Sequence, residues 1–198
     1  ETPQGNVAEV TVNFEGDTDA GWLIIGDEED VGYQANVSID AEGEDQVTIG
    51  FNTYLAGQLE QSGVDVSDIV WVEDDDSDAE IVSADFGESD IDTILEPGDY
   101  DLPVAASSGD VTDAASAMEL SDDIGTLWIR ERSTDAIQLW TASDSTINDI
   151  DAVEDIVSEV EDGTVTQDDT FARGDQVIVQ VTASGVEGAL EANGGVND

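Results

Sequence analysis

The sequence predicts a mainly β protein, a β-sandwich with two or three short helical insertions. Many short segments alternate apolar and polar residues with period two, and turn residues separate them at regular spacing. Such alternation is typical of strands that bury one face, and about nine or ten of them at this spacing are typical of a sandwich. The strongest pattern of helical period is confined to residues near 149–162. We therefore expect sheets to form the core and helices to be minor additions.

The clearest alternation lies in residues 31–54. Its apolar positions share one face, and they are Val31, Tyr33, Ala35, Val37 and Ile39, followed by Val47, Ile49 and Phe51. A short acidic loop at 40–45 separates the two runs, so we predict a hairpin. The glycosylation sequon Asn36-Val37-Ser38 lies in the first run. The alternation turns Asn36 away from the core, and we predict an N-linked glycan on it.

Two further strands are predicted before this hairpin. In the strand at 7–14, every second residue is apolar, namely Ala8, Val10, Val12 and Phe14, whereas residues 22–25 are apolar throughout and predict a strand buried on both faces. Residues 1–6 are mostly polar, so the segment 1–14 is a possible donor strand that leaves its own domain and completes a neighbour's sheet. The alternative is that the strand stays in its own domain and that assembly uses other surfaces.

The middle of the chain predicts two more hairpins, 69–72 with 80–86 and 126–132 with 137–140. Pro97-Gly98 predicts a turn that leads into another strand, because Pro fixes φ and Gly tolerates a positive φ. Residues 107–120 are rich in Ala, and their apolar positions recur at helical spacing. We therefore expect a short helix there.

The C-terminal part predicts the main helix and the last strand. Apolar residues at helical spacing mark the helix at 149–162, and they are Ile150, Val153, Ile156, Val157 and Val160. The strand at 176–183 is expected to point Val177, Val179 and Val181 into the core, and a short helix follows at 184–192. We expect one domain over 1–192 and a Gly-rich tail at 193–198.

Charge sets the solvent in which this chain is expected to fold. Asp and Glu total 50 and Lys and Arg total 3, for a formal net charge of −47. Self-repulsion of this size opposes compaction unless salt screens it, and the Debye length falls from about 10 Å at 0.1 M to about 3 Å at 1 M. The alternative, an acidic disordered chain, fits the interspersed apolar alternation poorly. We expect a folded protein of molar salt that binds neither nucleic acid nor an anionic membrane.

The residue types present restrict the possible chemistry. The chain has no His, Cys or Lys, which excludes disulfides, Ser–His and Cys–His nucleophiles, Schiff-base lysines and histidine zinc sites. A carboxylate pair is sufficient for glycoside hydrolysis, but no pair stands out among so many, and we expect no enzyme. No apolar run approaches the roughly 20 residues of a membrane span, so we expect no direct membrane insertion by this chain.

Two acidic clusters are candidate sites for calcium or magnesium, because hard cations bind carboxylate oxygens in loops. Their candidate ligands are Asp27, Glu28 and Asp30 in the first cluster and Asp74 and Asp76 in the second. Neither cluster has EF-hand spacing, and a solvated acidic loop is the alternative for both.

Candidate interface residues lie on two predicted strands. Trp128, Arg130 and Arg132 share one side of 126–132, where the arginines could bind an acidic neighbouring subunit. The alternative is that they pair with carboxylates of their own chain. On the possible donor strand, the candidates are Val10, Val12 and Phe14.

Several segments resemble a module repeated across haloarchaeal cell-surface glycoproteins, a group that includes proteins with a BGTF surface domain. The resemblance extends over most of the chain, in residues 26–37, 51–57, 132–136, 140–142, 173–175 and 183–192. In addition, Glu96-Pro-Gly-Asp-Tyr-Asp-Leu is similar to the turn and strand of many immunoglobulin-like surface domains. The resemblance implies an immunoglobulin-like sandwich on an extracellular, glycosylated protein of a cell envelope, and it brings no catalytic residues.

Two functions are expected from these observations. The first is a non-enzymatic structural subunit that self-associates into a filament, pilus or S-layer at the cell surface, with donor-strand addition of residues 7–14 as one route. The second is an adhesin-like module that binds glycan or protein ligands. The chain begins with Glu1 instead of Met, so we expect that a signal peptide has been removed or that the chain is excised from a longer protein.

Overall fold

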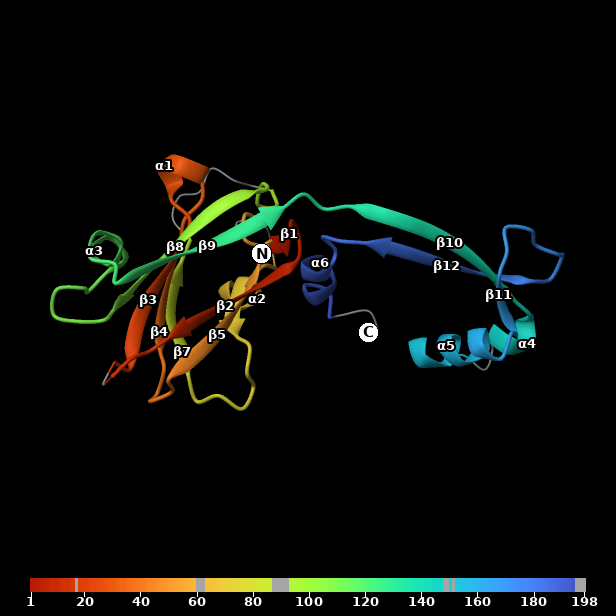
Figure 1. The fold of residues 1–198 in the computed structure, drawn as a ribbon, viewed down its shortest axis with the longest axis horizontal. Helices are drawn as coiled ribbons and strands as arrows, with labels where there is room; N and C mark the ends of the chain where they lie inside the picture. The colour runs from red at the N-terminus through yellow and green to blue at the C-terminus, as the bar shows by residue number, and fades with distance from the viewer. Residues whose placement is uncertain (17, 60–62, 87–92, 148–149, 151, 195–198) are drawn as a thin grey trace. The chain divides into compact units, whose positions relative to one another are not determined.

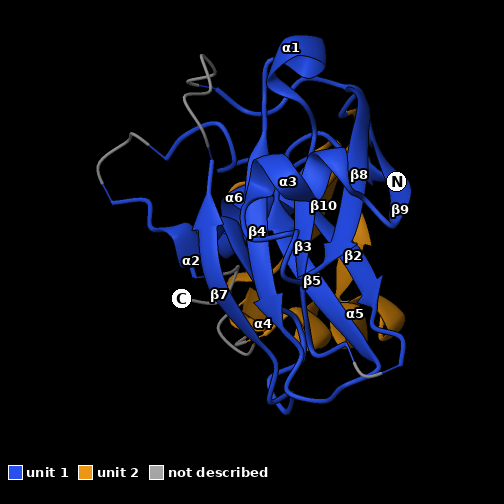
Figure 2. Cartoon of the chain, turned by 90° about the vertical axis from the view of Figure 1, so that its left-hand side faces the viewer, with its two compact units in different colours: residues 1–132, 184–198 blue, residues 133–183 orange. Residues whose placement is uncertain are grey.

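The computed structural model describes residues 1–16, 18–59, 63–86, 93–147, 150 and 152–194. The chain divides into two compact units (Figure 2): unit 1 comprises Glu1–Arg132 and Ser184–Asp198, and unit 2 comprises Ser133–Ala183. This division differs from the single domain predicted over 1–192. The reason is that the strands of 133–183 pair with one another and form a sheet of their own.

Unit 1 is a sandwich of two sheets (Figure 1). The six-stranded sheet has the order β1 (Thr2–Pro3), β9 (Asp123–Arg130), β8 (Gly98–Ala106), β3 (Ala20–Ile25), β4 (Ala35–Asp40) and β7 (Glu80–Asp85). The three-stranded sheet has the order β2 (Val7–Asn13), β5 (Gln46–Asn52) and β6 (Val70–Val72). The predicted mainly β sandwich is confirmed.

The main core of unit 1 contains buried residues from both sheets. Alternation supplies them as predicted, since Tyr33, Ala35, Val37 and Ile39 are fully buried and so are Ile49 and Phe51. A smaller cluster lies apart from this core, where Ile24 and Ala105 pack with Val111 and Ala117 of the segment around α3 (Ala114–Glu119). Residues 23–25 are thus buried on both faces, as predicted, and Trp22 is partly buried.

All three predicted hairpins are wrong. The strand β4 pairs with β3 and β7, whereas β5 pairs with β2 and β6, so the acidic loop at 40–45 connects the two sheets instead of two neighbours. The segment 73–79 does the same between β6 and β7. The third pair is separated because β9 belongs to unit 1 and β10 (Thr134–Ala142) to unit 2.

Unit 1 also contains short helices. They are α1 (Glu28–Val31), α2 (Val66–Ile69), α3 and, after the chain returns from unit 2, α6 (Glu187–Glu191). The side chain of Asp113 caps α3 by accepting the Ser116 N–H at 2.9 Å. The predicted helices at 107–120 and 184–192 are therefore confirmed with narrower bounds.

Unit 2 is a three-stranded sheet, in the order β11 (Val165–Gln167), β10 and β12 (Gln176–Ala183), with α4 (Asp144–Ile147) and α5 (Val153–Glu161). The main helix is confirmed as α5, although Asp149 and Asp151 of the predicted span lie outside the described residues. One face of the sheet buries Ala142 and Val165. The opposite face is open, and the prediction that the valines of β12 point inward is wrong: Val177, Val179 and Val181 are 47%, 58% and 56% exposed.

Candidate functional site

The free edge of β2 is the first feature of unit 1 that can bind another molecule. Among the described residues β2 pairs with β5 alone, in an antiparallel ladder from Val7↔Asn52 to Asn13↔Gln46. The Phe14 N–H donates to the Asp45 carbonyl at 2.9 Å, so the even-numbered residues of β2 bond to β5. The backbone groups of Glu9, Thr11 and Asn13 therefore face away from the sheet.

The N-terminal end of this edge is already occupied. The Val7 N–H donates to a Glu187 carboxylate oxygen at 3.3 Å, and the Val7 carbonyl accepts the Thr2 hydroxyl at 3.2 Å. Beyond Val7, no backbone group among the described residues bonds to the outward-facing backbone groups of Glu9, Thr11 or Asn13. An unpaired edge of this kind is a template for an added strand.

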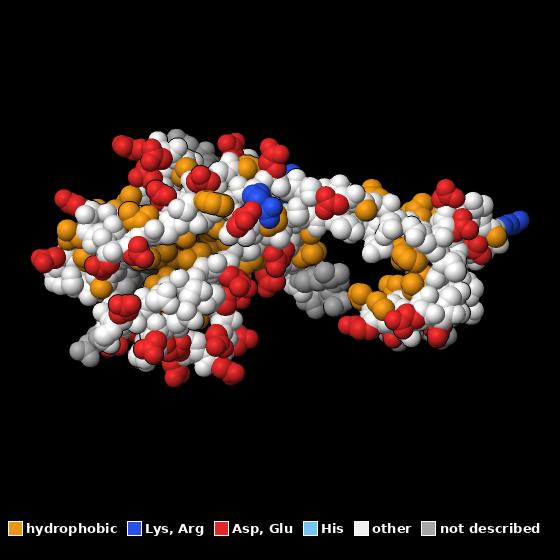
Figure 3. Space-filling model, in the orientation of Figure 1, with side chains coloured by type: hydrophobic (Ala, Val, Ile, Leu, Met, Phe, Trp, Pro, Cys, Tyr) orange, Lys and Arg blue, Asp and Glu red, His pale blue; other side chains and the backbone are white. Residues whose placement is uncertain are grey.

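A hollow of about 560 Å³ lies along the free edge. Its walls are the residues 10–15 of β2 and its continuation, parts of β3 and β8, and the start of β9. Apolar side chains from both sheets line it, including Val10, Val12, Leu102 and Val104. Figure 3 shows hydrophobic side chains in the space between β9 and β2, surrounded by acidic ones. The sandwich is thus open beside β2, and Gly125 on the inner face of β9 is exposed.

The predicted interface residues have three different environments. The side chains of Val10, Val12 and Phe14 point into their own core and are each 8% exposed. Trp128 and Ile124 both lie on the outer face of β9, and they are 55% and 58% exposed. Arg130 forms an ion pair with Glu1 of its own chain, and the aliphatic part of the exposed Arg132 lies over Gly185. The structure therefore brings Trp128 and Arg130 onto one face and separates them from the β2 valines.

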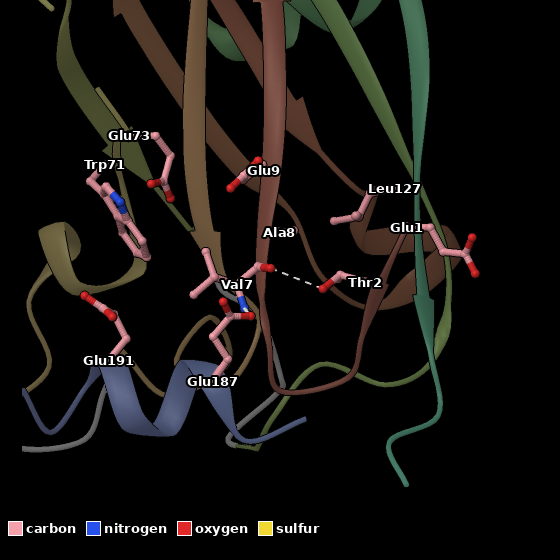
Figure 4. A pocket seen from close by; sticks show the side chains of 10 residues that line it. All are labelled: Glu1, Thr2, Val7, Ala8, Glu9, Trp71, Glu73, Leu127, Glu187 and Glu191. Atoms are coloured by element: carbon pink, nitrogen blue, oxygen red, sulfur yellow. Dashed lines mark hydrogen bonds between the residues drawn. The ribbon is translucent and has the colours of Figure 1, made fainter. Parts of the chain in front are cut away.

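A second hollow, of about 450 Å³, is acidic. Figure 4 shows Glu9 and Glu73 directed toward the same space as Glu187 and Glu191 of α6, with the Trp71 ring beside them. Partial burial, followed by the nearby Glu9 carboxylate, raises the pKa of Glu73. The carboxylates of this cluster repel one another, and the repulsion from Glu9 favours the protonated form of Glu73.

The predicted cation ligands have local structural roles. Asp27 caps α1 by accepting the Glu29 N–H at 2.8 Å, and Asp74 accepts the Asp76 N–H at 3.0 Å in a turn. Glu28 and Asp30 are exposed in the first turn of α1, where the helix dipole favours negative charge. Across the residues that the structure describes, no group of three or more carboxylates is arranged to hold a metal ion. Calcium or magnesium binding stays a prediction.

Asn36 is less accessible than its predicted role requires. It lies within the six-stranded sheet opposite Ile24 of β3 and Asp85 of β7, on the face away from the main core, as the alternation predicts. However, that face is covered, and Asn36 is only 9% exposed, with its Oδ1 accepting the Gln34 Nε2–H at 2.7 Å. A glycan on Asn36 would require this amide to turn out of the sheet. The expected exposure is wrong, and this burial argues against the predicted glycan, whose presence the structure does not test.

Sequence reasoning missed both the free edge of β2 and the open face of unit 2. Alternation identifies which residues of a strand share a face. It does not identify which strand ends a sheet or what covers that face. The uncharged stretch Gln176–Ala183 was not a signal, because 46–59 and 102–109 are also uncharged and form other parts of the fold.

Comparison with known proteins gives the family. Residues 1–109 match the family model described as "Domain of unknown function (DUF7827)". The chain is 36% identical over 190 residues to "Cell surface glycoprotein" of Haloferax gibbonsii, with 96% of the chain and 19% of the relative covered. It is 35% and 34% identical, over 94% of its length, to "Cell surface glycoprotein 1" and "Cell surface glycoprotein 2" of Haloarcula hispanica, again covering 19% of each.

The chain thus spans about a fifth of the length of the curated relatives that it matches. No solved structure matches it, so the immunoglobulin-like assignment stays a prediction. None of the helices in the described residues is long and apolar enough to cross a membrane. The resemblance to haloarchaeal cell-surface glycoproteins is confirmed, and the chain belongs to the DUF7827 family.

Proposed function

We propose that this chain is a non-enzymatic structural part of a haloarchaeal cell surface that acts by self-association into a filament or S-layer. The observation that carries the proposal is the similarity to three cell surface glycoproteins over 94–96% of the chain. The net charge of −47 supports an environment of molar salt, in which repulsion between copies is screened.

The outer face of β9 supports self-association. Trp128 and Ile124 together expose an apolar surface on a chain whose surface is otherwise rich in carboxylates. Exposed aromatic residues flanked by arginine are enriched in protein interfaces. Arg130, held beside Trp128 by Glu1, can add a charge-assisted contact to an acidic neighbouring copy.

Donor-strand addition of residues 7–14, which the sequence suggested, is not the mechanism of assembly that we favour. Residues 7–13 pair over their whole length with β5 of the same chain, and Ala8, Val10 and Val12 fill its core. Removing β2 from its own sheet would expose this core to solvent. We therefore expect assembly to use surfaces that the folded chain already exposes. An adhesin-like binding module is the alternative function, and it would use the same exposed Trp128 for a glycan or protein ligand.

Negative-stain microscopy of the purified chain in molar salt separates the two functions. Ordered filaments or lattices would support the structural role, whereas monodisperse monomers at high concentration would favour the binding module. Trp128→Ser should weaken assembly. Val82→Ser is the matched control, because Val82 is 59% exposed on the edge strand β7.

A further inference from the structure

Two strand edges that have no backbone partner among the described residues, those of β2 and β12, are complementary to each other. We infer that β12 of one copy pairs in parallel with the free edge of β2 in a second copy, and that the valines of β12 fill the hollow beside β2. The inference rests on the proposed self-association and adds a second contact to the one proposed at the outer face of β9.

The backbone of β12 presents the edge that this pairing requires. The Asp168 N–H donates to the Leu139 carbonyl at 3.2 Å, so the odd-numbered residues of β10 bond toward β11 and the even-numbered ones toward β12. The register Trp140↔Ile178 then assigns the even-numbered residues of β12 to β10. The N–H and C=O groups of Val177, Val179 and Val181 therefore face the free edge.

Side-chain direction selects a parallel arrangement. In β2, the residues with outward backbone groups (Glu9, Thr11 and Asn13) carry side chains on the outer face, and Val10 and Val12 point into the hollow. In antiparallel pairing, residues that exchange hydrogen bonds lie opposite each other, so the β12 valines would be on the outer face. In parallel pairing, a residue that bonds to the partner lies opposite one that does not, which places Val179 beside Val10 or Val12.

Charge favours β12 as the occupant. Glu15, Asp122 and Asp123 line the hollow, so a strand that brought carboxylates into it would add repulsion and desolvation. The strand β12 has the sequence QVIVQVTA, without a charged residue. Its exposed valines continue, through the pairs Ile137↔Val181 and Leu139↔Val179, into an aliphatic face of unit 2. That face would cover apolar surface that the sandwich leaves open.

Pairing of β2 with β2 of another copy is less suitable. Residues of β8 and β9 line the hollow, so the six-stranded sheet extends past the edge of β2. In a β2–β2 pair, two such extensions would compete for the same space. The sheet of unit 2, whose aliphatic face is uncovered, can place β12 beside β2 without this competition for space.

Cysteine cross-linking tests the contact directly, because the wild-type chain has no cysteine. One chain carries Thr11→Cys, and a second, distinguishable by a size tag, carries Gln180→Cys or Ile178→Cys. Parallel pairing places one of these positions opposite Thr11 on the outer face, within reach of a disulfide. Mixing the chains in molar salt under mild oxidation should give mostly a disulfide-linked heterodimer. It should form between Thr11→Cys and either Gln180→Cys or Ile178→Cys.

Two controls make the result specific. Val179→Cys should not cross-link with Thr11→Cys, because its side chain lies on the other face, and Val82→Cys should not, because β7 is not involved. A disulfide with Val179→Cys at the expense of both other positions would overturn the parallel register. A lack of preference over Val82→Cys would overturn the contact.

A charge variant separates this inference from the proposed function. Val179→Glu should reduce assembly in molar salt at least tenfold, whereas Val82→Glu should leave it within twofold. Assembly that persists unchanged in Val179→Glu contradicts the β2–β12 contact and leaves the structural role standing. A wild-type chain that stays monomeric at every concentration contradicts both.

Discussion

The side-chain amide of Asn52 donates to the backbone carbonyl of Gly188 at 2.9 Å, which joins the end of β5 to α6 across 136 residues of sequence. The same side chain accepts the N–H groups of Tyr54 and Leu55 at 3.0 and 3.2 Å, and Asn52 is fully buried. Through this residue, the segment that returns from unit 2 is fixed to the sandwich.

Asn52→Ala should therefore lower the free energy of unfolding by about 2–4 kcal/mol, because three bonds are lost and buried backbone groups are left unpaired. Urea unfolding in molar salt measures this change. The control is Asn13→Ala, because Asn13 is exposed and the hydrogen bond that its side chain accepts from Gln46 should be worth no more than about 0.5 kcal/mol. Equal effects of the two variants would refute the role of Asn52.

The hydroxyl of Tyr33 gives the opposite prediction. Tyr33 is fully buried against Phe51 and Tyr100, and its hydroxyl has no hydrogen-bond partner in the part of the chain that the structure describes. Tyr33→Phe should leave the unfolding free energy unchanged or raise it by about 1 kcal/mol, since an unsatisfied buried group is removed. Tyr100→Phe should cost about 1 kcal/mol, because its hydroxyl donates to the Glu96 carbonyl at 2.9 Å. A larger loss for Tyr33→Phe than for Tyr100→Phe would contradict this assignment.

Glu73 predicts a dependence on pH. Because its pKa is raised in the folded state, the protonated form is favoured there, and the group's contribution to stability is lost as pH rises through that pKa. Glu73→Gln should thus raise the melting temperature at neutral pH, and the gain should vanish below pH about 4, where the carboxyl is protonated in both states. Molar salt should reduce the gain. Glu131→Gln, at an exposed position, should change little; a gain from Glu73→Gln that is independent of pH would contradict the mechanism.

The burial of Asn36 bears on modification of the native protein. With 9% of the residue exposed and its amide bonded to Gln34, the folded chain should not present it for glycosylation. Mass spectrometry of the digested native protein should give the unmodified mass for the peptide that contains Asn36. A glycan on that peptide, absent in Asn36→Gln, would show that the sheet opens there or that modification precedes folding.

The sequence predicted the positions of strands and helices better than it predicted which strands pair with each other. Alternation located β2, β5 and β12, and helical spacing located α5, because each pattern depends on local geometry. Pairing depends on which sheet a strand enters, and loops as short as 41–45 cross between sheets as readily as they form hairpins. Similarly, Val177, Val179 and Val181 share a face as predicted, but no local pattern shows that the face is uncovered.

Among the candidate site residues, the sequence was most useful where side-chain direction was sufficient. Trp128 was expected on the outer side of its strand and is exposed there. The acidic clusters were not informative about metal ions, because in a chain of 50 carboxylates local density is high everywhere. The acidic hollow of Glu9, Glu73 and Glu187 could not be predicted from the sequence, because its residues come from three distant segments of the chain.

We propose above that this chain associates with itself in molar salt, the solvent for which its charge is suited. Sedimentation velocity in molar salt over a wide range of concentrations tests it most directly. We expect species larger than the monomer that grow with concentration and dissociate when salt is lowered to about 0.1 M, where the Debye length is about 10 Å. A single monomeric species at every concentration in molar salt would contradict it.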